Sequence, residues 1–268
     1  DAVAPSGTWR WSVRVGETAI AASAPDAHAR PLGFAVGWSP SAVKTVSDDL
    51  HVAHDHWRTD DAHGVAGDVE SMTRCVGRRL GTSISIDTVV QWPRDLGDTT
   101  LAGSTLLLPE SPDWDIADKG PGRWLRHAHI ATAIARRTLV DTADLREAQG
   151  SAWWSAAVPG AIGLLCVGDV DGVDALRQTM GLFAERTSRA LAGSAVPVER
   201  LDHASAHGWV SSYGPLAALG WTSRQSGEAL AHISQGIASG QSVEEAAAPS
   251  MSDAERLAAF GPPRATEL

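Results

Sequence analysis

The chain has 268 residues, 43% of them apolar, and a formal net charge of −10 at pH 7. A chain of this length can bury a core without metal or disulfide staples, and an acidic chain without a basic stripe is not expected to bind nucleic acid or an anionic membrane surface. No apolar run reaches the length of a membrane span, because the longest, residues 156–167, is broken by Pro159 and Gly160.

Two cysteines, Cys75 and Cys166, stand far apart and without the spacing of a metal site. They can form a disulfide, but buried free thiols are the favoured interpretation. No signal peptide is visible, so the sequence leaves the compartment open, with the cytoplasm slightly favoured.

The first half of the chain is predicted to be rich in strands, because short apolar segments alternate with polar residues and end at turn-forming residues. A helix is predicted over residues 67–80 from its apolar spacing, and Gly81 ends it. The predicted strands cover residues 9–15, 33–38, 48–57, 83–92 and 104–108.

After residue 120 the apolar spacing becomes helical. Trp124, His127 and Ala131 recur at three- and four-residue intervals, which places His127 on the buried face and His129 roughly 200° round the helix from it. Later helices are predicted over residues 170–191 (with Asp169 as N-cap), 208–220, 226–239 and 252–260. A β-rich beginning followed by a helical half predicts an α+β fold, with a β-rich segment over residues 1–47 and the main domain over 48–268.

The first helix of this second half contains one histidine of an otherwise incomplete zinc motif. Residues 127–131 read His-Ala-His-Ile-Ala. Glu at position 128 and His at position 131 would complete HExxH, which sets two zinc-binding imidazoles one helical turn apart with a general base between them. Of that motif only His127 is present.

The order of these elements resembles the aminopeptidase N and leukotriene hydrolase group of gluzincin metallopeptidases. Residues 32–57 look like the passage from that family's N-terminal β domain into its catalytic domain, residues 67–92 look like its helix and first sheet strand, and residues 104–110 are similar to the strand that borders the substrate. The resemblance implies a thermolysin-like catalytic domain, with a small mixed sheet followed by a helical half and preceded by a short β-rich segment.

The same resemblance implies that the zinc site has been lost. The family's general base falls at Ala128, its second histidine ligand at Ala131 and its glutamate ligand at Gln149, within the segment Ala-Gln-Gly-Ser-Ala. The segment that binds a substrate's free amine would fall near residues 98–101, which carry no acid at the right place. Since zinc hydrolysis needs three protein ligands and a base, we expect no metal, no cofactor and no peptidase activity.

Tyr213, the only tyrosine, falls at the family's catalytic tyrosine. A phenol can donate a hydrogen bond to a developing negative charge without a metal, so Tyr213, His127 and Gln149 form the candidate catalytic set. The alternatives are a packing tyrosine and a buried histidine whose ring nitrogens are hydrogen-bonded. The candidate substrate-binding residues are His129, Trp153, Trp154 and Trp209, although tryptophans in helices often only pack.

Two further histidine groups are weaker candidates for a metal site. His51, His54 and His56 would alternate along a strand, with His51 on the opposite face from the other two, and a solvated strand face explains them more simply. His203 and His207 are four residues apart and could form a ligand pair in a helix, but Asp202 is the one acid near them.

Two classes of function follow. In the first, the chain is a pseudo-peptidase domain whose former cleft binds and transforms a small molecule or peptide by a cyclisation, isomerisation or other biosynthetic tailoring step. In the second, it is a non-catalytic binding or partner subunit that recognises a peptide or another protein. An active zinc metallopeptidase is the least supported interpretation.

Overall fold

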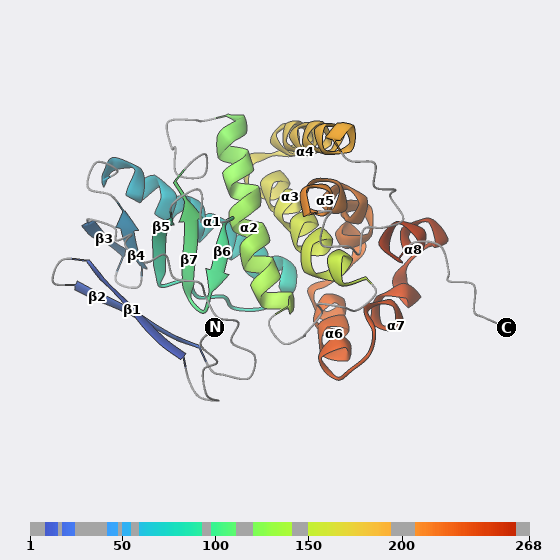
Figure 1. Ribbon diagram of the computed structural model, residues 1–268, viewed down its shortest axis with the longest axis horizontal. Helices are drawn as coiled ribbons and strands as arrows, with labels where there is room; N and C mark the ends of the chain where they lie inside the picture. Colours follow the sequence, from blue (N-terminus) through green and yellow to red (C-terminus); the bar gives the residue numbers. More distant parts are fainter. Residues whose placement is uncertain are drawn as a thin grey trace.

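The computed structural model describes residues 9–15, 18–24, 42–47, 50–54, 59–92, 98–110, 120–140, 150–193 and 207–260. Strands occupy the first part of the chain and helices the second (Figure 1). The predicted α+β class and small mixed sheet are confirmed.

The strands form two sheets. β1 (Trp9–Val15) and β2 (Thr18–Ala24) make an antiparallel hairpin of their own. The main sheet has the order β3-β4-β5-β7-β6, with β4, β5 and β7 parallel and the two edge strands antiparallel to their neighbours. Its strands are β3 (Ala42–Ser47), β4 (Leu50–His54), β5 (Thr88–Trp92), β6 (Thr100–Ala102) and β7 (Thr105–Pro109).

The parallel strands β4 and β5 are joined by the helix α1 (Thr59–Leu80), as a parallel pair requires a crossover connection. α1 packs on β3 and β4, and α2 (Pro121–Val140) packs on β6. α1 ends where Gly81 takes a φ of 66°, which confirms the predicted stop, although the helix begins earlier than predicted. A boundary after residue 47 would separate β3 from β4, which are paired strands of one sheet.

Several predicted strands are shorter in the structure. β5 covers residues 88–92 of the predicted 83–92, and residues 83–87 belong to no helix or strand. β4 lies within the predicted 48–57, and β7 covers residues 105–109. The predicted strand over residues 33–38 lies outside the described residues.

One central helix organises the second half of the chain. A π-helix, η3 (Trp153–Ala157), continues directly into α3 (Val158–Asp171), and both pack against α2 and α5 (His207–Arg224). α4 (Val173–Gly193) follows after Gly172, whose φ of 97° breaks the helix. The predicted N-cap at Asp169 is therefore wrong, because Asp169 belongs to the last turn of α3. The C-terminal helices are α6 (Gly227–Ala238), α7 (Val243–Ala247), η6 (Ala248–Ser250) and α8 (Asp253–Phe260).

The continuous helical stretch Trp153–Asp171 is long and apolar enough to cross a membrane by length and composition alone. Pro159 follows directly on η3, so its missing N–H leaves one backbone hydrogen bond of the continuous helix unmade, and the carbonyl oxygen of Ser155, four residues earlier, accepts from Arg136 Nε at 2.9 Å instead. This is weak evidence for a membrane span, since 67% of the stretch is buried by the rest of the chain, as in the core helix of a globular fold.

Candidate functional site

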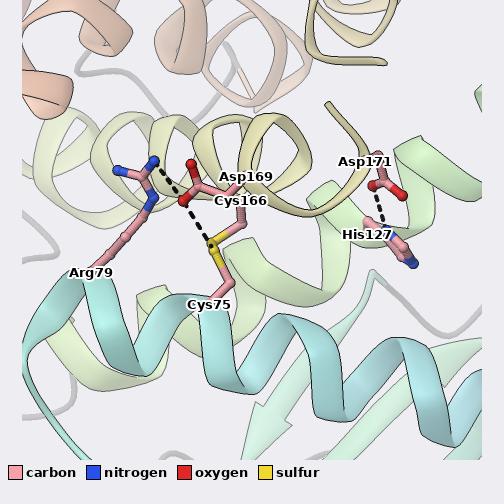
Figure 2. The surroundings of a disulfide bond; sticks show 6 residues. All are labelled: Cys75, Arg79, His127, Cys166, Asp169 and Asp171. Carbon is pink, nitrogen blue, oxygen red and sulfur yellow. Dashed lines mark hydrogen bonds and ion pairs between the residues drawn. A yellow bond between two sulfur atoms is a disulfide. The ribbon is translucent and has the colours of Figure 1, made fainter. Parts of the chain in front are cut away.

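His127 lies in the interior among three helices. α2 carries it, its Nε2 lies 2.8 Å from Oδ1 of Asp68 in α1, and its Nδ1 lies 2.7 Å from Oδ2 of Asp171 at the end of α3. Figure 2 shows Asp171 reaching the imidazole from the last turn of α3. The side chain of His127 has no exposed surface, so the prediction that it points to the buried face is confirmed.

Asp68 also binds two arginines of α2. Arg126, fully buried, contacts Oδ2 through Nε at 2.9 Å and Nη2 at 2.7 Å, and Arg123, at the surface, contacts Oδ1 through Nη2 at 3.1 Å. The centre therefore holds the carboxylates of Asp68 and Asp171 against cationic groups from α2. A buried charge is tolerated when it is paired and hydrogen-bonded in this way.

The pKa values of this centre favour the charged forms. Burial acts to lower the pKa of His127, but the carboxylates of Asp171 and Asp68 outweigh it and raise that pKa above the ordinary 6.5. Burial acts to raise the pKa of Asp68, but His127 and Arg126 outweigh it and hold that pKa below 3.8. The Nε2 contact is poorly aligned for a hydrogen bond, so we treat it as an ion pair between imidazolium and carboxylate. An imidazolium has no lone pair for a metal and cannot act as a base.

Positions 128 and 131, where HExxH would have its glutamate and second histidine, are filled by close packing. Ala128 and Ala131 are fully buried. A Cβ built on Gly163 of α3 would lie 2.6 Å from the carbonyl oxygen of Ala128, so the backbones of α2 and α3 touch at this level. Among the described residues no group of three or more His, Cys, Asp or Glu side chains could hold a metal, and Gln149 lies outside them.

A disulfide joins the same helices α1 and α3 that hold His127. Cys75 and Cys166 are both fully buried and bonded, so the interpretation of free thiols is wrong. Arg79, one turn after Cys75, forms an ion pair of 2.8 Å with Asp169, one turn after Cys166 (Figure 2). The sequence could not show this pairing, because it depends on how two distant helices are aligned.

Tyr213 lies at the other end of α3. It is half-buried in α5, and its neighbour Gly214 packs against Ala157, where a Cβ on the glycine would lie 3.0 Å from the alanine Cβ. α3 has 14 residues, so Asp171 is about 21 Å further along the helix axis than Ala157. Because the imidazole of His127 points to the Asp171 end, the structure does not bring His127 and Tyr213 into one site.

The candidate substrate-binding residues are divided. Trp154 is fully buried and donates from Nε1 to the carbonyl oxygen of Leu139 at 3.3 Å, and the ring of Trp153 lies 6.3 Å from that of Trp221 in the core. The alternative of packing tryptophans fits both. His129 is half-buried on α2, and Trp209 lies in the first turn of α5, where side chains are not described.

The other histidine groups are partly outside the described chain. His54 is buried in β4 and His51 is half-buried, so neither belongs to a fully solvated face. His56 and His203 lie outside the described residues, and His207 is the first residue of α5.

Sequence reasoning missed Asp68, Arg126 and Asp171. A signal was present for the first two: Asp68 stands among the apolar positions of α1, and Arg126 is adjacent to those of α2, so opposite charges were placed on two predicted buried faces.

Comparison of the chain with protein-family models and with curated proteins finds no match.

Proposed function

We propose that this chain is a non-hydrolytic, metal-independent domain with a gluzincin-like fold, and that its role is to bind a peptide or protein partner. The observation that carries the proposal is the full burial of the His127 side chain between the carboxylates of Asp68 and Asp171. The order of elements supports the relationship to gluzincins: a helix between two sheet strands, an edge hairpin, and then the helix with the histidine.

This arrangement does not meet the requirements of zinc-dependent hydrolysis. A histidine that binds zinc must be neutral and must have a ring nitrogen free for the metal, whereas both ring nitrogens of His127 face carboxylates, at 2.8 and 2.7 Å, and its side chain is sealed from solvent. The histidine that would serve catalysis in a gluzincin instead holds three helices together. A binding role needs none of these groups to be reactive.

A second candidate is metal-free chemistry on a small molecule or peptide at Tyr213. The observation in its favour is the π-helix η3, which packs against the helix that carries Tyr213. π-helical turns are rare and occur frequently at functional sites. In this case the phenol is the acid or oxyanion donor, and His127 has no direct part.

The disulfide bears on the compartment. Disulfides persist in oxidising environments and are rare in the reducing cytoplasm. The bond between Cys75 and Cys166 therefore supports an extracytoplasmic location over the cytoplasmic one that composition slightly favoured.

The test of the proposed function combines metal content with a peptidase assay. The purified chain is equilibrated with zinc, desalted and analysed for metal, and then assayed for release of a fluorophore from aminoacyl-arylamides. We expect neither stoichiometric zinc nor metal-dependent release. One tightly bound zinc per chain, with release that chelation abolishes, would show an active metallopeptidase instead.

A further inference from the structure

We propose that a groove beside the C-terminal half of α1 binds an extended, acidic segment of a partner protein. This inference rests on the proposed binding role, and it names the site and the chemistry of the partner. The groove has a volume of about 650 Å³ and is open to solvent, which is within the range of ligand-binding pockets. It is lined by Leu50, Val69, Glu70, Thr73, Arg74, Gly77, Arg78 and residues 81–86.

One wall of the groove carries two arginines that the fold does not use. Arg74 and Arg78 are exposed, lie one turn apart on α1, and make no hydrogen bond or ion pair in the described part of the chain. Their neighbour Arg79 is paired with Asp169. A guanidinium presents a planar fork of donors that matches a carboxylate, so two unpaired arginines at this spacing form a receptor for acidic groups.

The opposite wall is a segment that lies outside the sheet. Residues 83–86 belong to no helix or strand and make no hydrogen bond within the described part of the chain, whereas Thr82 N–H donates to the Gly77 carbonyl and Asp87 N–H to the Ser104 carbonyl on either side. Ile84 and Ile86 pack against the core, while Ser83 and Ser85 are exposed, which is the alternation of a strand. An exposed backbone of this kind is a template to which an extended peptide can add.

The floor and the charge balance define the occupant. Ile84 and Ile86, which are half-buried, supply most of the accessible apolar surface of the lining, since Leu50 and Val69 are buried, and Glu70 is the one acid among the lining residues. An extended peptide that pairs with residues 83–86 would turn alternate side chains toward this floor and its remaining acidic side chains toward Arg74 and Arg78. Because the whole chain carries a net charge of −10, a locally cationic groove attracts an acidic segment where the rest of the surface repels it.

The test begins with a random displayed-peptide library selected against the full, disulfide-bonded chain. A selected peptide is then synthesised and titrated into ¹⁵N-labelled protein, with chemical shifts followed by NMR. We expect peptides that alternate acidic and aliphatic residues, and shifts concentrated at Gly77 and residues 81–86. The double variant Arg74→Gln/Arg78→Gln should weaken binding at least about tenfold, and methylation of alternate peptide amides should weaken it similarly, since charged and backbone hydrogen bonds are lost.

Arg177→Gln on the surface of α4 is the control and should leave binding unchanged, because Arg177 is exposed but is not among the residues that line the groove. If selected peptides bind with shifts elsewhere, or with affinity unchanged in the double variant, the groove proposal is wrong while the binding role stands. If binding needs the arginines but not the peptide amides, the site is a simple anion site and the proposed pairing with residues 83–86 is wrong. If no peptide is selected, both this inference and the proposed binding role fail.

Discussion

The two ends of α3 are held in place by different kinds of interaction. At the C-terminal end, Asp171 and Asp169 form ion pairs with His127 and Arg79, and Cys166 is bonded to Cys75 of α1. At the N-terminal end the Arg136 guanidinium of α2 donates from Nε to the carbonyl oxygen of Ser155 in η3 at 2.9 Å. There the helix touches α5 through small residues, with Gly160 against Pro215 and Gly214 against Ala157.

This difference teaches where the molecule can tolerate change. The C-terminal end gains its stability from specific long-range pairs, and removal of one member of the His127–Asp171 pair leaves the other buried without it. The N-terminal end approaches α5 through small residues, so it is sensitive to added volume. Tyr213 is half-exposed near the N-terminal end of α3, so a chemical role of this residue would be located at that end.

The largest effect is expected from breaking the disulfide. Cys75 and Cys166 are 91 residues apart, and the chain-entropy estimate for closing a loop of that size is about 4.5 kcal/mol of stabilisation. Urea unfolding in the presence and absence of reductant measures it. The Cys75→Ala/Cys166→Ala variant should be as unstable as the reduced parent and should not respond to reductant. Equal stability of the parent with and without reductant would show that ion pairs alone stabilise the C-terminal end of α3.

Removal of Asp68 is expected to cost about 4 kcal/mol of unfolding free energy, because Asp68→Ala removes the carboxylate that contacts two nitrogens of the fully buried Arg126 guanidinium. Urea unfolding of the oxidised protein measures this cost. The matched control is Asp174→Ala, which removes an exposed ion pair with Arg177 and should change stability by no more than about 0.5 kcal/mol. Similar costs for the two variants would contradict a buried charged centre.

Substitution by alanine should change stability in opposite directions at two glycines, one at the N-terminal end of α3 and one in α4. A Cβ at Gly160 would lie 2.3 Å from the ring of Pro215, so Gly160→Ala should destabilise the protein by about 1–3 kcal/mol. Gly181 in α4 has no atom within 4 Å of such a Cβ, so Gly181→Ala should stabilise it by up to about 1 kcal/mol. Thermal unfolding of both variants tests this, and a tolerated Gly160→Ala would show that α3 and α5 can separate.

Stability at the His127 end should depend on pH. The folded-state pKa of His127 is raised above 6.5, so its contribution is complete below pH 6.5 and is lost as pH rises through the folded-state pKa. Asp68 behaves oppositely: its pKa is lowered from 3.8, so its contribution is lost as pH falls through the folded-state pKa. Between pH 3.8 and 6.5 both are present. Above pH 6.5 the parent should lose at most about 1.4 kcal/mol per pH unit relative to His127→Gln. Parallel stability curves for the two proteins, measured by urea unfolding, would contradict an imidazolium at this position.

The smallest effect on stability is expected for Tyr213→Phe, which keeps the ring and removes one hydroxyl, at a cost of about 1 kcal/mol or less. If the Tyr213 end is catalytic, the same change should lower the rate roughly a hundredfold, as for loss of one preorganised donor. The measurement is a melting curve together with an assay on any substrate found by a metabolite screen. Full activity with an unchanged melting curve would make Tyr213 a packing residue.

The sequence by itself determined the local elements and the direction of single side chains. Helical spacing placed His127 on the buried face, and the left-handed conformation open to Gly81 ended α1 where predicted. The α+β class also followed, because strand and helix periodicities occupy different halves of the chain. These features depend on neighbours a few residues away.

Only the tertiary structure decided what those side chains meet. Asp68, His127 and Asp171 come from three helices and become one centre only when the helices are aligned, and the pairing of Cys75 with Cys166 depends on the same alignment. Likewise β5 begins at Thr88 instead of residue 83, because β4 and β7 provide pairing partners only from there onward. Local periodicity fixes which way a residue points, but the partner across a long loop is selected by packing, which no short stretch of sequence contains.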